Sequence, residues 1–259
     1  MTAQLKSTNQ GQTLILTLSD PALRNAIGPA MYAAGIEALN VAETNPDIRS
    51  VVITGEGSHF CAGSDVHRLH SNRTQPAEVQ AQTIESLHNW MEAVRTFPKP
   101  VIAAVEGAAV GSGFSLALMC DLIVAANNSV FAMAYSNLGL SPDAGASWNL
   151  THALPRQLSA ELLLLGDRIS AERLHALGVV NRIVDSGHAL PQALALADRI
   201  NARAPNVMNC VKELLNDASM HSLTEQLAQE RNQFVKNLHH PNAGIGIQAF
   251  LNKEPPNYK

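Results

Sequence analysis

Residues 99–126 combine apolar runs with closely spaced glycines, a pattern suited to holding an electron-rich group. An apolar run at 101–105 is followed by a Gly-Ser-Gly turn at 111–113 and then by a second apolar run at 114–119. This order predicts a buried strand, a tight turn and a buried helix. The first turn of a helix presents unpaired backbone N–H groups and the positive end of the helix dipole. We therefore expect the turn to bind a phosphate, a dinucleotide or a carbonyl oxygen.

A nucleotide or phosphate fits this turn poorly. The dinucleotide-binding fingerprint requires a third glycine, and Leu116 stands in its place. The acidic residue that would bind a ribose about 20 residues further on has no clear position at a strand end. The chain has no Gly-Lys-Ser/Thr sequence, which excludes a Walker-type phosphate loop.

Nucleophilic and metal-dependent chemistry have little support in the sequence. Ser112 and Ser115 are possible nucleophiles, but there is no G-x-S-x-G motif and no histidine is marked out as a partner. His67 and His70 lie three residues apart on a predicted helix, and a His-His pair stands at 239–240. Without an H-E-x-x-H motif or a cysteine cluster, we expect these histidines at the surface and predict no metal site.

A second junction of small residues, Phe-Cys-Ala-Gly-Ser-Asp at 60–65, follows a predicted strand at 51–54 and precedes a helix-like segment at 66–70. Asp65 suits a helix N-cap and Gly63 suits a turn, which explains both residues without any chemistry. Two strand–glycine–helix junctions, however, can each aim one backbone N–H at a common point. A pair of converging donors is the geometry of an oxyanion hole.

Predicted strands alternate with predicted helices up to about residue 158, and helices dominate afterwards. This alternation indicates an α/β domain with a largely parallel sheet, and the helical end suits a lid or a subunit interface. The tail at 254–259 is expected to lie outside the core. Strands are predicted at 13–18, 51–54, 101–105, 122–126, 130–133 and 179–184, and helices at 25–40, 77–97, 114–119, 159–165, 171–177, 189–204, 207–217, 221–238 and 243–251.

Composition narrows the class of protein. The 259 residues are 46% hydrophobic, which is enough for one large core, and 15% charged. The net charge is −4 and there is no basic stripe, so we expect no nucleic-acid partner. The first twelve residues are polar, which argues against a secretory signal, and no apolar run reaches the roughly 18 residues of a membrane helix. Three widely spaced cysteines favour free thiols in the cytoplasm.

Over nearly its whole length the chain resembles the crotonase, or enoyl-CoA hydratase/isomerase, superfamily. The combination of matching segments is highly specific. They are, in order, RNA at 24–26, VITG at 52–55, FCAGSD at 60–65, KPVIAAVEG at 99–107, CD at 120–121, GL at 139–140 with Pro142, RISA at 168–171, GVV at 178–180, and GIQAF at 246–250 with Lys253. The resemblance implies a spiral α/β core of ββα units at 1–200, a helical lid and trimer interface at 201–259, and a homotrimer or hexamer.

The same resemblance implies a coenzyme A thioester as substrate, from fatty acid or aromatic acid metabolism, and no separate cofactor. Two backbone N–H groups would polarise the thioester carbonyl and stabilise an enolate, and by motif position these belong to Ala62 and Ser112. Position 112 is often glycine in the family, but only its N–H is needed. The remaining contacts to the substrate would come from Arg24, Ala26, Gly63, Ser64, Asp65, Val66, Gly111, Ser115, Tyr135, Leu138, Phe250 and Lys253.

The chain departs from the hydratases of the family at their two glutamates, which fall on Ser115 and Tyr135. Neither hydroxyl is a base near neutral pH, so addition of water to a 2-enoyl thioester is not expected. Asp143 offers a carboxylate at the position of the sole acid in isomerases of the phenylacetate-pathway type. We therefore predict an enoyl-CoA isomerase in which Asp143 shuttles a proton. Asp143 also suits the cap of a helix beginning near residue 144.

Two other functions stay open at this point. One is a hydratase-like lyase of the same family with an atypical base. The other is a non-catalytic acyl-CoA-binding protein that kept the fold and lost the acids.

Overall fold

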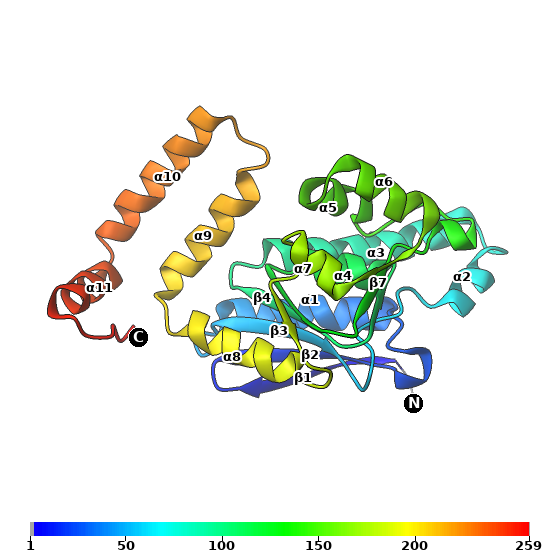
Figure 1. Ribbon diagram of the computed structural model, residues 1–259, viewed down its shortest axis with the longest axis horizontal. Helices are drawn as coiled ribbons and strands as arrows, with labels where there is room; N and C mark the ends of the chain where they lie inside the picture. The colour runs from blue at the N-terminus through cyan, green and yellow to red at the C-terminus, as the bar shows by residue number, and fades with distance from the viewer. Residues whose placement is uncertain (1–2, 259) are drawn as a thin grey trace.

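Six strands form the main sheet of the computed structural model, which describes residues 3–258 (Figure 1). β1 pairs antiparallel with β2, and every following pair is parallel. The strands are, in sheet order, β1 (Gln4–Gln10), β2 (Thr13–Ser19), β3 (Ser50–Gly55), β4 (Val101–Val105), β6 (Leu122–Ala126) and β9 (Arg182–Val184). β4 is buried along its whole length, as a parallel strand covered by helices on both faces must be.

A second, three-stranded sheet branches from the first. It consists of β5 (Ala108–Val110), β7 (Val130–Ala132) and β8 (Arg168–Ser170), with β5 parallel and β8 antiparallel to β7. The chain passes from β4 of the first sheet into β5 of the second and then into the buried helix α4 (Ser112–Met119). This ββα order confirms the predicted α/β fold and puts the start of α4 where the two sheets meet.

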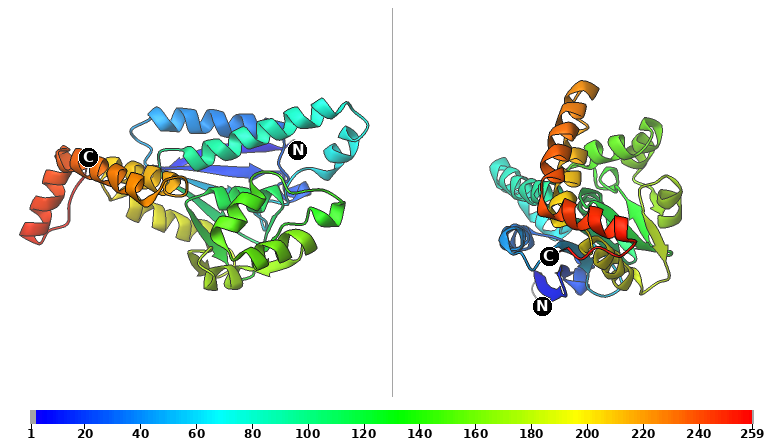
Figure 2. Two further views of the ribbon diagram at one scale, coloured as in Figure 1. Left: turned by 90° about the horizontal axis from the view of Figure 1, so that it is seen from above. Right: turned by 90° about the vertical axis from the view of Figure 1, so that its left-hand side faces the viewer.

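Helices cover both faces of the main sheet. α1 (Pro29–Thr44) and α3 (Ala77–Thr96) lie side by side over one face, and α8 (Ala189–Asn201) packs on the other (Figure 2). Alternate residues of β3 enter separate clusters, Ile53 on the α1/α3 side and Val52 on the α8 side. Trp90 of α3 stacks on Tyr32 of α1, and Gly35 makes room for its indole ring.

Shorter helices surround the second sheet, and a helical arm leaves the core. The shorter ones are α2 (Val66–Asn72), α5 (Ala146–Ala153), α6 (Arg156–Leu165), α7 (Ala171–Ala176) and the 3₁₀ turns η1 (Pro21–Leu23) and η2 (Ser136–Leu138). The arm is α9 (Pro205–Asp217), α10 (Leu223–Leu238) and α11 (Pro241–Asn252), and it projects away from the sheets in Figures 1 and 2. The division of the chain at residue 200 stays a prediction.

An ion pair and several hydrogen bonds tie the arm to the core. Lys212 on α9 is buried, and its Nζ lies 2.8 Å from Asp121 Oδ2. The same carboxylate oxygen accepts from Val101 N at 2.7 Å. Among residues 3–258, no helix has the length and apolar character needed to cross a membrane.

Several predicted element bounds were wrong. The helix expected at 25–40 begins at Pro29, because Arg24 and Asn25 take left-handed φ angles of 51° and 59°. The strand expected at 179–184 is shorter than predicted, because only β9 (Arg182–Val184) is extended. The pattern missed β1 because this edge strand is almost entirely exposed and polar, and it missed β5 and β8 because each has only three residues. It also missed α5.

Candidate active site

The first candidate donor is the N–H of Ser112 at the start of α4. Gly111 takes φ 54° and ψ −123°, a conformation that side chains disfavour, and this turns the chain from β5 directly into the helix. Ser115 N closes the first helical turn on Gly111 O at 3.0 Å. The N–H groups of residues 112–114 therefore have no intrahelical acceptor, as at every helix start.

The loop at 60–65 lies against β5, but it presents a different donor from the one predicted. Cys61 N donates to Ala108 O at 3.0 Å, and Val110 N donates to Cys61 O at 2.9 Å. Ala62 N donates to Arg24 O at 2.9 Å. This bond contradicts the expectation that Ala62 contributes to an oxyanion hole, because an N–H already paired with a carbonyl is not available to a substrate.

The free backbone donor of this loop is the N–H of Ser64. Within residues 3–258 it meets no backbone or side-chain acceptor, whereas Gly63 O accepts from Ile27 N at 2.8 Å. Ser64 Oγ lies 3.1 Å from Ser112 Oγ. Gly63 allows this approach, because a Cβ there would lie 2.7 Å from Val110 O. The two loops thus bring Ser64 and Ser112 side by side.

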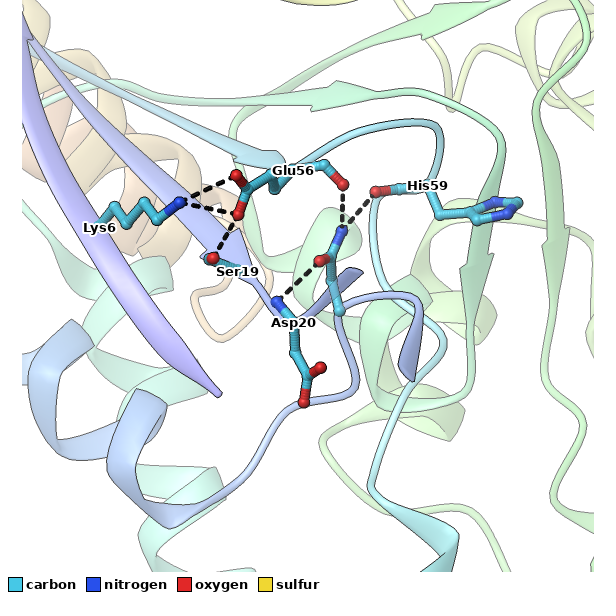
Figure 3. Close-up of polar contacts among 6 residues, drawn as sticks. Lys6, Ser19, Asp20, Glu56 and His59 are labelled. Carbon is cyan, nitrogen blue, oxygen red and sulfur yellow. Dashed lines mark hydrogen bonds and ion pairs between the residues drawn. The ribbon is translucent and has the colours of Figure 1, made fainter. Parts of the chain in front are cut away.

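Asn25 joins the segments that support this pair, and Figure 3 marks its hydrogen bonds at the labelled residues Asp20, Glu56 and His59. Its Nδ2 donates to Glu56 O at 2.9 Å and to His59 O at 2.7 Å, and its Oδ1 accepts from Asp20 N at 3.0 Å. Asn25 thereby joins the turn that carries the Arg24 carbonyl to the segment that leads into the loop at 60–65. Asparagine tolerates its left-handed φ better than most residues.

The Glu56 side chain holds the outer edge of the same region (Figure 3). Its carboxylate accepts from the Ser19 hydroxyl and forms an ion pair with Lys6 at 2.9 Å. The Ser19 bond, followed by the Lys6 bond, lowers the pKa of Glu56 from its ordinary value. The group is solvent-exposed, so this pair contributes little to stability.

A carboxylate and a phenol meet on the segment between β7 and α5. Tyr135 Oη donates to Asp143 Oδ1 at 2.8 Å. The N-cap of α5 is Gly145, with no side-chain cap, and Asp143 contributes only its backbone carbonyl, which accepts from Ala146 N. The interpretation of the Asp143 side chain as a helix cap was therefore wrong.

Ser115 connects this acid to α4. It is completely buried, and its Oγ has no hydrogen-bond partner within the described residues. It lies beside Tyr135 and lowers the pKa of that phenol, but burial and the Asp143 carboxylate raise the pKa by more, so it stands well above its usual range. A Cβ on Gly111 would lie 3.8 Å from the Tyr135 ring. Tyr135 therefore stays protonated, next to the turn that carries the Ser112 donor.

His88 holds the backbone that follows the acid. Its Nε2 accepts from Ala144 N at 3.2 Å, and Ala144 has a left-handed φ of 52°. No sequence motif marked His88, which lies on α3, 56 residues before Ala144.

The other predicted contact residues fall into two groups. Asp65 caps α2 by accepting from His67 N at 2.9 Å, which confirms its structural interpretation. Arg24, Ala26, Val66 and Leu138 lie on segments adjacent to the two loops or to Tyr135. Phe250 and Lys253 belong to the end of α11, in the arm that lies far from α2 and α4 in Figures 1 and 2, so a single chain does not bring them to the site.

Tyr32 and Arg68 are polar neighbours of the site that sequence reasoning missed. Tyr32 is buried beside Ser64, and Arg68 Nη2 donates to Tyr32 Oη at 3.4 Å. Both lie on helices at positions where the sequence pattern is explained by ordinary packing, so nothing in the sequence marked them as part of a site. For metals, residues 3–258 contain no group of three or more histidine, cysteine, aspartate or glutamate side chains able to hold an ion.

Comparisons with known proteins agree with this geometry. The family model for enoyl-CoA hydratase/isomerase matches residues 8–259. The 1,2-epoxyphenylacetyl-CoA isomerase of Escherichia coli (strain K12) is 34% identical over 95% of this chain and 94% of its own. The 2,3-dehydroadipyl-CoA hydratase of the same organism is 32% identical over 99% of both chains.

A solved structure extends the likeness to three dimensions. The crystal structure of an enoyl-CoA hydratase from Polaromonas sp. JS666 is 62% identical and superposes with a TM-score of 0.98, covering 99% of this chain and 100% of the other. The match therefore includes the helical arm as well as the core. The family model and these relatives match the chain over nearly its full length, and the two glycine junctions and the acid beside α4 agree with them. The chain therefore belongs to the enoyl-CoA hydratase/isomerase family of enzymes.

Proposed function

We propose that the protein is an enoyl-CoA isomerase that moves a double bond along the acyl group of a coenzyme A thioester. The observation that carries this proposal is the Tyr135–Asp143 contact at 2.8 Å, because it puts one carboxylate beside the helix that presents the Ser112 donor. The N–H groups of Ser64 and Ser112 are proposed to bind the thioester oxygen.

The proposed reaction needs a single base. With a 3-enoyl thioester, Asp143 takes a proton from C2, and the electron pair moves into the carbonyl to give a dienolate. The two N–H donors stabilise the negative oxygen, which is where charge develops. Asp143 then returns the proton to C4, the double bond forms between C2 and C3, and the carboxylate is regenerated.

Hydration is the weaker interpretation of the same site. Direct addition of water needs a base to activate the water, and the two positions that hold glutamates in the hydratases of the family are occupied by Ser115 and Tyr135. Burial keeps the Tyr135 phenol protonated, so it cannot act as that base. Because the relatives include both an isomerase and hydratases, their names alone do not separate the two reactions.

The test compares two substrates and two variants. The protein is incubated with a 3-enoyl-CoA and with a 2-enoyl-CoA, and the products are separated by chromatography. We expect isomerisation of the 3-enoyl thioester, with a loss of about 100-fold or more in Asp143→Asn, the range for removal of a general base. Asp47→Asn, which removes an exposed carboxylate in a loop, is the control and should keep full activity.

Other outcomes would favour the alternatives. Isomerisation that survives Asp143→Asn undiminished would exclude Asp143 as the base. Rapid addition of water to the 2-enoyl thioester would favour a hydratase with an atypical base. Tight binding of coenzyme A thioesters without turnover of either would favour a non-catalytic binding protein.

The arm supports a proposed assembly into a homotrimer or hexamer. Large apolar side chains lie exposed along α9–α11, more than a single chain normally leaves in water. They include Leu215, Leu223, Leu227, Phe234, Phe250 and Leu251. In such an assembly, Phe250 and Lys253 would contact substrate in a neighbouring copy. Light scattering coupled to size-exclusion chromatography tests the proposal, and a monomer would exclude it.

The proposed compartment is the cytoplasm. All three cysteines are free thiols, and Cys61 and Cys120 are buried, as befits a protein kept in a reducing environment. Fluorescence microscopy of the tagged protein in its native host would test this placement.

A further inference from the structure

We propose that the side chains of Ser64 and Ser112 form a positioning bridge that sets the spacing of the two backbone donors. The proposal rests on the oxyanion site proposed above. The two hydroxyl oxygens lie 3.1 Å apart, and Ser112 is buried. Each residue therefore offers its N–H to the substrate and holds the other residue through its side chain.

The bridge adds a side-chain hydrogen bond between two segments that are otherwise joined by backbone hydrogen bonds and close backbone packing. The loop at 60–65 pairs with β5 through Cys61 and Ala109, before the loop reaches Ser64. Beyond Gly63 the two chains diverge, one into α2 and the other into α4. Alanine or glycine at 64 and 112 would leave both N–H groups in place but remove the side-chain hydrogen bond between the two residues.

Tyr32 packs against Ser64 on the side away from Ser112. Its neighbour Tyr32 is buried, and burial raises the pKa of this phenol despite the opposing effects of Arg68 and Ser64. Tyr32 Oη donates to Ile27 O at 3.3 Å, and Ile27 N donates to Gly63 O at 2.8 Å. Ser64 thus lies between a fixed phenol and the Ser112 hydroxyl, which restricts where its N–H can point.

The energetic reason for such a bridge is preorganisation. Donors stabilise a developing oxyanion only when they already converge on its position, and loss of one donor costs about 100- to 1,000-fold in kcat. A bridge that only aligns the donors is worth less, so we expect about a 10-fold fall in kcat without it. KM should change little, because a loosely aligned pair still binds the ground-state carbonyl.

The experiment is a double-mutant cycle of Ser64→Ala, Ser112→Ala and both together. One readout is kcat and KM on a 3-enoyl-CoA. The other readout needs no turnover. The compound 4-(dimethylamino)cinnamoyl-CoA absorbs at longer wavelength when its carbonyl is polarised, so the shift of its absorption band on binding measures how strongly the two N–H donors polarise the carbonyl. We expect each single variant to lose the same share of kcat and of the red shift, with no further loss in the double variant. Ser64→Thr, which keeps the hydroxyl, should restore both.

The control is another hydroxyl pair away from the site. Thr13 Oγ1 and Ser50 Oγ lie 3.0 Å apart where β2 and β3 begin, and both residues are buried. Ser50→Ala should lower the unfolding free energy and leave kcat and the band unchanged.

Three results would overturn the bridge. They are single variants with an unchanged band and kcat, strictly additive losses, and wild-type protein that binds the chromophore without a red shift. The last would overturn the oxyanion site as well. A red shift in the wild-type protein without isomerisation would overturn only the proposed reaction. The bridge would then still be tested by the absorption band of the bound chromophore in the variants.

Discussion

The Tyr135 phenol donates to the Asp143 carboxylate at 2.8 Å, and the same phenol lies beside the buried hydroxyl of Ser115, which has no hydrogen-bond partner among residues 3–258. One contact thus connects the acid to the helix that presents a candidate oxyanion donor. Tyr135 and Ser115 stand at the two positions at which the hydratases of the family hold glutamates. The site is therefore equipped to hold one carboxylate in one orientation.

Tyr135→Phe tests the importance of that contact. The ring is retained, but the carboxylate loses a donor that both orients it and stabilises its ionised form. We expect kcat for isomerisation to fall about 10-fold, the equivalent of one hydrogen bond to a charged group, with KM nearly constant. An unchanged kcat would mean that Tyr135 only fills space.

Asn25 is expected to be the most sensitive position of the supporting loops. Asn25→Ala removes three hydrogen bonds and leaves an alanine at φ 59°, so the unfolding free energy should fall by about 3 kcal/mol. Asn25→Gly loses the same bonds but accepts the backbone angle, and should recover about 1 kcal/mol. Urea denaturation measures both. Equal stability of the two variants would show that the left-handed angle carries no strain.

The Lys212–Asp121 pair should govern attachment of the arm. Burial raises the pKa of Asp121 although Lys212 opposes it, so each charge depends on the other. Lys212→Met should cost about 3 kcal/mol of unfolding free energy, at the low end for a broken buried pair because Asp121 keeps some exposure to water. Adding Asp121→Asn should recover part of that loss. Denaturation of the single and double variants checks this, and additive losses would contradict it.

The buried thiol of Cys61 should make the fold less stable at high pH. Burial raises the pKa of Cys61 to about 12, whereas in the unfolded chain the thiol ionises near pH 9. Above pH 9 the unfolded state releases this proton and the folded state keeps it, so stability falls as pH rises. The contribution is about 1.4 kcal/mol per pH unit between pH 9 and 11.

Cys61→Ala should remove that part of the slope. Urea denaturation at pH 9, 10 and 11, with a reductant present, gives the comparison. Ser129→Ala, a change at another buried residue without an ionising thiol, is the control. A slope equal to that of the wild type in Cys61→Ala would contradict the assignment.

Much of the fold could be read from the sequence because its signals are local. The apolar run that forms β4 is bounded by prolines and glycines, and its burial follows from its composition. The strand β1 could not be read, because its polar side chains face water and only pairing with β2 keeps it extended. The start of α1 was missed because the left-handed angle of Asn25 is set by bonds to residues more than 30 positions away.

For the site, the sequence by itself determined the two glycine junctions, and its resemblance to the family implied Ser115 and Tyr135 in place of the glutamates and Asp143 as the acid that remains. Only the tertiary structure decided which backbone donors are free. The N–H of Ala62 is paired with the carbonyl of Arg24, 38 residues earlier, whereas the N–H of Ser64, whose side chain meets Ser112 48 residues later, has no acceptor among residues 3–258; we therefore propose Ser64 as the donor. The structure also showed that the Asp143 side chain meets Tyr135 and does not cap α5. The physical reason is the same in each case: residue type fixes which groups can donate or accept, but long-range packing decides which partner each group meets.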